Sequence, residues 1–169
     1  MLLTITAQNV VGLDDYSRDK LGKLLDTFNE HAFKNAEKKK YYEGKVSLGE
    51  VNLGIALPDG MKGLEIGCAW GAKAVDVLAA RSMFDGFVGI NGNEVEELTR
   101  LVVENKLVAQ YMKACRDELE FGSTFCTLST GSTGVKIRFH SPMTAAALWN
   151  GEKNRIDCGF AIIDTAPAN

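Results

Sequence analysis

The strongest constraint on the fold is a long amphipathic pattern between Asp14 and Gly44. Its apolar residues recur at steps of three and four, the spacing of one face of an α-helix: Leu21, Leu24, Leu25, Phe28, Ala32 and Ala36. Asp14 and Asp15 stand at the expected start, where the helix dipole favours negative charge, and Lys38 to Lys40 stand at the expected end. Gly44 follows the last turn, where glycine commonly ends a helix. The pattern predicts one long helix.

A second helical pattern begins with acidic residues at Glu94, Glu96 and Glu97 and extends to Leu119. Asn105 falls in the middle of this pattern, and asparagine competes with the helix for backbone hydrogen bonds. The sequence therefore predicts either one helix or two helices that meet at a bend near Asn105.

Beyond Gly122 the pattern changes to that of strands. Val135, Ile137 and Phe139 alternate with polar residues, as in a half-buried strand of an antiparallel sheet. Ser123 to Thr130 precedes this strand, and two further apolar segments flank the turn at Asn150-Gly151: Ala145 to Trp149, and the alternating Ile156, Cys158, Phe160 and Ile162.

Helices followed by hairpin-linked strands predict an α+β fold, with long amphipathic helices followed by an antiparallel β-meander. We expect a single domain over residues 1–169, with a helical part at about 14–121 and a β part at about 123–164. Leu2 to Ala7 alternates weakly and is expected to form an edge strand or a docking arm.

The stretch from Gly63 to Phe87 allows two interpretations with different functional consequences. In one, Leu64 to Gly67 is a buried strand that ends in a glycine-rich turn around a cofactor. The Walker A motif, GxxxxGK[ST], does not fit. With Gly67 as its first position, Ala72 stands where the second glycine belongs and Ala74 stands where the hydroxyl residue belongs.

The cofactor alternative is a class I S-adenosylmethionine-dependent methyltransferase, whose first motif is similar to Glu65, Gly67 and Gly71. Ala69 replaces the middle glycine, and its methyl group obstructs close approach of a ligand to the backbone. Asn91 also replaces the acid that such enzymes use for the ribose. A doubly wound fold further needs helices alternating with parallel strands, which the order of elements does not provide.

The second interpretation is a packing helix from Gly67 to Arg81, which binds no ligand. Its apolar residues would lie on one side at helical spacing: Ile66, Trp70, Ala74, Val77 and Leu78. We expect Trp70 to be substantially buried and Glu65 to lie near the helix start. Gly67 and Gly71 would each cost about 1 kcal/mol relative to alanine, unless another helix packs closely against them.

Composition indicates an ordered domain, with 46% hydrophobic and 24% charged residues and a net charge of −3. The cysteines and histidines are widely spaced: Cys68, Cys115, Cys126, Cys158, His31 and His140. Buried reduced thiols are expected rather than a zinc site, and His140 and the lysine run are expected to be solvated rather than catalytic or bound to nucleic acid. The N-terminus lacks a signal-peptide pattern and no apolar run has the length of a membrane span, which favours the cytoplasm or an assembly formed there.

Several short motifs occur in a characteristic order. The first group is Tyr41-Tyr42-x-Gly44, Ala56-Leu57-Pro58, Trp70, Ala74-Val75-Asp76, Leu78-Ala79-x-Arg81 and Asp85-Gly86-Phe87. The second group is Asn105-Lys106-Leu107, Phe121 to Phe125, Ser141-Pro142 and Trp149-Asn150. This order resembles that of tailed-bacteriophage portal proteins of the Siphovirus-type, YYxG-containing branch, over roughly Leu24 to Asp164. Ala69 and Ala74 depart from the pattern.

The resemblance implies an N-terminal fragment of the portal wing region, without the stem, clip and crown regions. It implies a structural subunit of a dodecameric ring at the capsid vertex, with no catalytic, cofactor-binding or metal-binding residue. Other portal subunits, the capsid, terminase and head–tail connector proteins would be its partners, and double-stranded DNA would pass through the channel. The fragment alone is expected to be monomeric or weakly associated.

Overall fold

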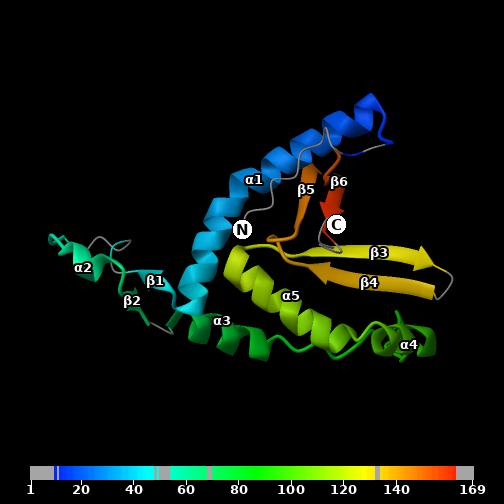
Figure 1. The fold of residues 1–169 in the computed structure, drawn as a ribbon. Helices are drawn as coiled ribbons and strands as arrows, with labels where there is room; N and C mark the ends of the chain where they lie inside the picture. The colour runs from blue at the N-terminus through cyan, green and yellow to red at the C-terminus, as the bar shows by residue number, and fades with distance from the viewer. Residues whose placement is uncertain are drawn as a thin grey trace, which may run out of the picture.

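A computed structural model describes residues 10, 12–47, 49, 54–67, 70–131 and 134–162 of the chain. The predicted α+β class is confirmed (Figure 1). The elements follow the order α1 (Asp15–Glu43), β1 (Val46–Ser47), α2 (Asp59–Lys62), β2 (Glu65–Ile66), α3 (Trp70–Arg81), α4 (Glu96–Glu104), α5 (Leu107–Phe121), β3 (Phe125–Gly131), β4 (Gly134–His140), β5 (Ala145–Asn150) and β6 (Arg155–Ala161). The expectation for Leu2 to Ala7 lies outside the described residues.

Helix α1 matches the predicted long helix at both ends. The carboxylate of Asp14 accepts a hydrogen bond of 3.0 Å from the backbone N–H of Ser17, which satisfies one of the unpaired donors at the helix start. Gly44 ends the helix with a φ of 69°, a left-handed conformation that glycine adopts readily. Leu24, Leu25 and Ala32 are buried along the predicted apolar face.

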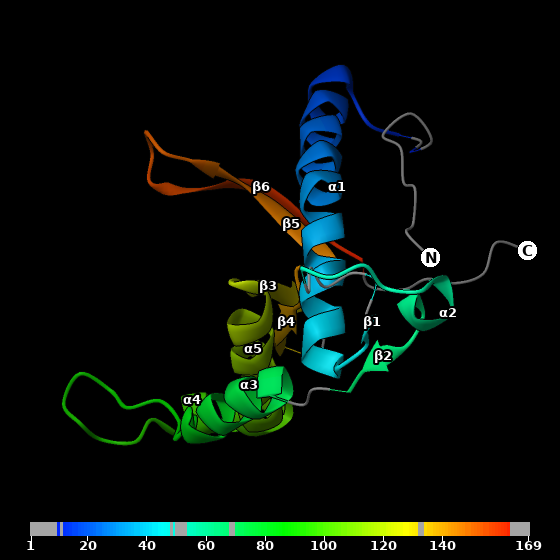
Figure 2. The same cartoon turned by 90° about the vertical axis from the view of Figure 1, so that its left-hand side faces the viewer.

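The strands after α5 pair as two separate antiparallel hairpins, β3–β4 and β5–β6. The predicted order of a meander is therefore present, but the described strands do not join into one sheet. Hairpin β3–β4 lies beside α5, and hairpin β5–β6 lies beside α1 (Figures 1 and 2). An isolated hairpin is only marginally stable in water, so each hairpin depends on the helix that it contacts.

Of the two alternatives that the sequence left open near Asn105, the structure has two helices that meet at a bend. Helix α4 ends at Glu104, α5 begins at Leu107, and Lys106 between them has a φ of 51°. A left-handed non-glycine residue costs roughly 1 kcal/mol or more, so the surrounding structure must hold it in place.

Two side-chain amides near this bend bind the backbone of β4. The Asn105 amide donates to the carbonyl of Val135 at 3.0 Å, and its oxygen accepts from the N–H of Ile137 at 2.9 Å. The Gln110 amide donates to the carbonyl of Ile137 at 3.1 Å and accepts from the N–H of Phe139 at 3.2 Å. We call Asn105 and Gln110 the amide clamp. It supplies β4 with the hydrogen bonds that a neighbouring strand would otherwise make.

We predict that Asn105→Ala destabilises the protein by about 2–3 kcal/mol, because it leaves partly buried backbone groups of β4 without partners. Asn105 is only 7% exposed, so water cannot readily replace its amide. Urea unfolding should show this loss, whereas Asn93→Ala, at an exposed residue, should change the free energy of unfolding by less than about 0.5 kcal/mol. Equal stability of the two variants would contradict the role of the clamp.

Helix α3 confirms the helical interpretation of its segment but not the expected buried face. The helix begins at Trp70 rather than Gly67, and the Trp70 side chain is 81% exposed, so the expectation that it is buried was wrong. Val77 and Leu78 are also exposed. The buried and half-buried residues of α3 are mostly small: Ala72, Val75, Asp76 and Ala79. Small side chains allow α3 to approach α1 and α5 closely, and this requirement selects the buried face.

The close approach of α1 explains why position 71 is a glycine. A Cβ atom at Gly71 would lie 2.9 Å from the carbonyl oxygen of Tyr41, near the end of α1. The expectation that a helix packs against a glycine here is thus confirmed for Gly71. Gly67 precedes the helix, and a Cβ atom there would meet nothing within 4 Å.

We predict that Gly71→Ala destabilises the protein by about 1–3 kcal/mol, because the new methyl group collides with backbone and the helices must separate. Gly22→Ala in α1 is the matched control, since its Cβ atom would meet nothing within 4 Å. That control should stabilise the protein by up to about 1 kcal/mol through helix propensity. Urea unfolding of both variants tests the difference, and a stabilising Gly71→Ala substitution would contradict the close contact.

Candidate interaction surfaces

Much of the large apolar surface of the described residues remains exposed. The exposed large apolar residues are Tyr16, Phe33, Tyr41, Ile55, Met61, Leu64, Trp70, Val77, Leu78, Met83, Phe87, Val88, Ile90, Val103, Val108, Met112, Leu119, Leu128, Trp149 and Ile156. By contrast, the buried apolar set contains five alanines: Ala32, Ala79, Ala114, Ala145 and Ala146. No described side chain is less than 2% exposed. Exposed apolar surface of this extent is typical of proteins that bury it against partners.

The loop between α3 and α4 presents the most exposed of these side chains. We call residues 82–95 the Ile90 loop. Its base is anchored by Phe84, whose ring lies 5.2 Å from that of Phe87 and 5.5 Å from that of Tyr111 in α5. Its tip is a turn closed by a 2.9 Å hydrogen bond from the N–H of Gly92 to the carbonyl of Gly89. The turn predicted at Asn91-Gly92 is therefore present, and the loop projects from the helices (Figure 2).

Apolar side chains and acidic side chains lie together on the Ile90 loop. Ile90 is fully exposed and Val88 is 74% exposed. Asp85, Glu94 and the adjoining Glu96 and Glu97 are exposed as well, and no lysine or arginine occurs between Ser82 and Thr99. One oxygen of Glu94 accepts a 2.8 Å hydrogen bond from the Thr99 hydroxyl, which holds that carboxylate at the base of the loop.

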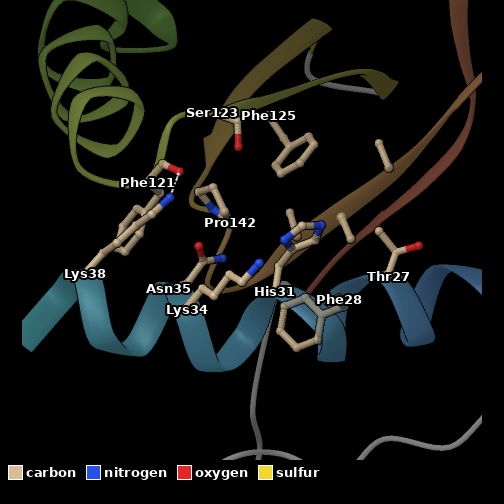
Figure 3. A pocket seen from close by; sticks show the side chains of 13 residues that line it. Thr27, Phe28, His31, Lys34, Asn35, Lys38, Phe121, Ser123, Phe125 and Pro142 are labelled. Carbon is tan, nitrogen blue, oxygen red and sulfur yellow. Dashed lines mark hydrogen bonds between the residues drawn. The ribbon is translucent and has the colours of Figure 1, made fainter.

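A cavity of about 350 Å³ lies between α1, the end of α5 and the starts of β3 and β5 (Figure 3). We call it the α1 cavity. Its apolar wall contains Phe28, Phe125, Pro142, Ala145, Ala146 and Ala147. Its polar wall comes mainly from α1: Thr27, His31, Lys34, Asn35 and Lys38. No aspartate or glutamate is among the described residues that line it.

Asn35 is the unusual polar residue of the α1 cavity. It is only 6% exposed, and no hydrogen bond joins its side chain to another described residue, so the part of its amide that stays accessible opens on the cavity. Figure 3 shows its amide facing the cavity between Lys34 and Lys38. An amide that opens on a cavity can both donate a hydrogen bond to and accept one from a group that enters it.

Lys40 lies exposed in the last turn of α1, as predicted for the lysine run, but Lys38 has a different role. The ammonium of Lys38 donates a 2.6 Å hydrogen bond to the carbonyl of Phe121, the last residue of α5. It therefore complements the C-terminal end of α5 rather than that of its own helix. Lys39 lies 3.8 Å from the carboxylate of Glu43, one helical turn further along α1.

Asp76 joins three helices, a role that the sequence did not reveal. The Tyr42 hydroxyl donates to its carboxylate at 3.0 Å, and the Nε atom of Arg116 donates at 2.9 Å. Burial, and then the bond to Asp76, raises the pKa of Tyr42. The spacing of Asp76 from Ala72 and from Ala79 puts all three residues on one face of α3.

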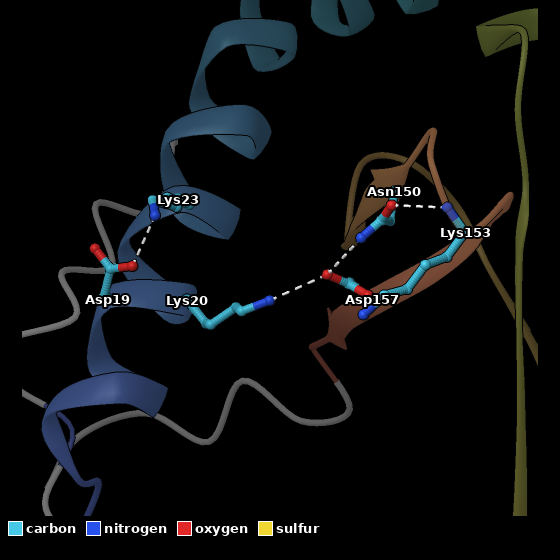
Figure 4. A network of polar contacts seen from close by, with 6 residues as sticks. All are labelled: Asp19, Lys20, Lys23, Asn150, Lys153 and Asp157. Carbon is cyan, nitrogen blue, oxygen red and sulfur yellow. Dashed lines mark hydrogen bonds and ion pairs between the residues drawn. The ribbon is translucent and has the colours of Figure 1, made fainter.

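A polar network fixes hairpin β5–β6 to the first half of α1 (Figure 4). The Lys20 ammonium lies 3.2 Å from the Asp157 carboxylate, which also accepts a 3.2 Å bond from the amide of Asn150. The bond from Asn150 and the bond from Lys20 lower the pKa of Asp157. Phe28 adds an apolar contact, with its ring 5.5 Å from that of Phe160 in an edge-to-face arrangement.

Two carboxylates near the end of α5 lie partly buried. Burial raises the pKa of both Asp117 and Glu120, and the charge of Asp117 raises that of Glu120 further. One buried oxygen of Glu120 has no hydrogen-bond partner among the described residues. The positive charges of Lys39 and Arg116 oppose both of these pKa shifts.

The residues of the methyltransferase alternative do not form a glycine turn around a ligand site. Glu65 lies in the short strand β2, opposite Ser47 of β1, rather than near the helix start. Gly71 lies within the first turn of α3 against Tyr41. Every strand pairing among the described residues is antiparallel, whereas the methyltransferase fold needs a parallel sheet.

The described cysteines are free, but only one of them is buried. Cys115 is buried, Cys158 is half-buried and Cys126 is exposed, so the expectation of buried thiols was wrong for Cys126. Cys68 lies outside the described residues. The described part of the chain contains no group of three or more side chains suited to hold a metal ion. None of its helices combines the length and the apolar character needed to span a membrane.

No protein-family model matches the chain, and no curated protein matches it.

His140 is half-buried rather than freely solvated. Its Nε2 atom lies 2.8 Å from the Thr127 hydroxyl on the paired strand. Burial lowers the pKa of His140, and the positive charges of Arg138 and Lys113 lower it further. The folded state therefore resists protonation of this imidazole more than the unfolded state does.

We predict that acidification from pH 7.5 to pH 5 weakens the fold partly through His140. The unfolded chain takes up a proton near pH 6.5, while the folded chain takes it up at a lower pH, so the contribution is intact above about pH 6.5 and is lost as the pH falls through the folded value. Urea unfolding across this range should show a smaller loss of stability for His140→Gln than for the unaltered chain. Coincident pH profiles would contradict the prediction.

Proposed function

We propose that the chain is a non-catalytic structural subunit of a tailed-phage portal ring. In this role its copies surround the channel for DNA packaging and ejection at the capsid vertex. Its other partners are the capsid, terminase and head–tail connector proteins, and its location is the virion.

The observation that carries a structural rather than a catalytic role is the exposed apolar surface. Trp70 is 81% exposed and Leu128 is 72% exposed, and they lie on different elements. Water contact with such side chains is unfavourable, so burial between subunits provides a driving force for assembly. An obligate subunit leaves this surface open in the isolated chain and covers it in the assembly.

The ordered sequence motifs are what favour a portal ring over another kind of assembly in this proposal. The resemblance extends over roughly residues 24–164 and so includes both the helices and the hairpins. Residues within these motifs support the fold: Asn105 clamps β4, and Asp76 joins α1, α3 and α5. A motif residue that holds elements together is what a structural subunit requires.

We predict that the complete reading frame encoding this chain, expressed in bacteria, yields ring-shaped particles in negative-stain electron micrographs. Analytical ultracentrifugation of the same material should give the mass of a closed oligomer. A well-folded product that stays monomeric at every concentration tested would contradict the proposal.

The same material separates this proposal from the methyltransferase alternative. Isothermal titration calorimetry with S-adenosylmethionine should show no binding. Binding in the micromolar range that Gly67→Arg abolishes would overturn the structural role and support an enzyme.

A further inference from the structure

We propose that the tip of the Ile90 loop of one copy of this chain inserts into the α1 cavity of a second copy. The inference rests on the proposed function in one respect, namely that the partner is another copy of the same chain. It adds the two surfaces that meet and the order in which they join the subunits.

The two surfaces differ in shape and lie apart on the same chain. The Ile90 loop projects near the start of α5, where Phe84 packs against Tyr111, and the α1 cavity lies at its end, where Phe121 and Ser123 line it. Tyr111 and Phe121 are ten residues apart in α5, so at 1.5 Å per residue the base of the loop and the cavity are separated by about 15 Å along the helix. A loop and a cavity at opposite ends of one subunit give a head-to-tail contact, which closes into a ring when the rotation permits.

The apolar parts of the two surfaces match. Ile90 and Val88 present branched side chains to solvent at the tip of the loop. The α1 cavity offers the rings of Phe28, Phe125 and Pro142 as its wall. A volume of about 350 Å³ is at the lower end of the range of about 300–1,000 Å³ for small-molecule sites. Such a volume suits one or two side chains rather than an extended ligand.

The charges of the two surfaces are opposite. The Ile90 loop and the start of α4 carry Asp85, Glu94, Glu96 and Glu97 without a compensating lysine or arginine before Arg100. The cavity carries the ammonium groups of Lys34 and Lys38 without a lining carboxylate among the described residues. Lys34 forms no ion pair with a described residue, so its ammonium is available to an incoming acid. Opposite charges around an apolar contact fix its orientation.

The unpaired amide of Asn35 completes the match. It is 6% exposed and faces the cavity, so a group that enters can hydrogen-bond with it. The tip of the loop carries the exposed side-chain amide of Asn91 next to Ile90. An amide can both donate a hydrogen bond to another amide and accept one from it, so the side chain of Asn91 can pair with that of Asn35.

Duplex DNA fits the cavity less well than this loop does. Phosphate contacts need cationic and polar groups only, and the aromatic wall of the cavity would gain nothing from a phosphate. We therefore treat DNA binding by this cavity as the competing outcome of the test.

The experiment uses two variants, each defective on one surface. Ile90→Asp places a charge at the tip of the loop, and His31→Glu with Lys34→Glu reverses the charge of the cavity. Sedimentation equilibrium should show self-association of the unaltered chain and at least about tenfold weaker association of each variant alone. An equimolar mixture of the two variants should form dimers and stop there, because it contains one intact loop and one intact cavity per pair.

Matched control variants test the specificity of the effect. Ser129→Asp places a charge at an exposed polar residue on β3, and Lys73→Glu alters an exposed lysine on α3, both outside the two surfaces. Both should associate as the unaltered chain does. High salt should weaken association of the unaltered chain, because the charges are close to solvent.

Several outcomes would overturn the inference. If the unaltered chain associates but the mixture of variants does not form dimers, the contact is wrong and the ring proposal stands. If the unaltered chain does not associate at any concentration, the contact is also wrong. The ring proposal is then tested separately, by whether the complete reading frame yields ring-shaped particles. If the cavity variant loses binding to labelled duplex DNA, measured by fluorescence anisotropy, but associates normally, the cavity is a DNA site.

Discussion

The contact between the amide clamp and β4 determines how the helical and β parts fit together. A strand in a two-stranded hairpin leaves one edge of backbone donors and acceptors unpaired, and burial of that edge without partners is costly. Asn105 and Gln110 supply these partners from the bend and first turn of α5. The left-handed Lys106 between the helices is the local strain that accompanies this arrangement. Hairpin β3–β4 therefore needs α5, and α5 needs the bend.

The remaining contacts attach further elements to α1 and α5 in pairs. Asp76 connects α3 to both helices, and Gly71 permits its close approach to α1. Lys20 and Phe28 hold hairpin β5–β6 to the first half of α1. Each attachment uses a few side chains rather than a common core. This arrangement explains why so many large apolar residues remain exposed and why their burial falls to partners in our proposal.

The sequence predicted the elements well because their signals are local. Asp14 and Gly44 indicate the ends of α1 because they are typical capping residues, and Asn105 indicates the bend because its side chain competes for backbone hydrogen bonds. The buried face of α3 was missed because hydrophobicity favoured Trp70, whereas packing between helices favoured small residues and Asp76. The α1 cavity could not be predicted from the sequence either, because segments about a hundred residues apart form it, such as those of Phe28 and Phe125. Only the tertiary structure brings Asn35 and Pro142 to the same site.

Helix α1 extends over 29 residues, so it is about 43 Å long. Its first half carries hairpin β5–β6 and its last turns carry α3, with the α1 cavity between them. A helix of this length behaves as a stiff rod over small displacements. A force that displaces the hairpin at one end of α1 would therefore also displace α3 at the other end. Within an assembly, the orientation of one neighbour would be coupled mechanically to that of the next through a single helix.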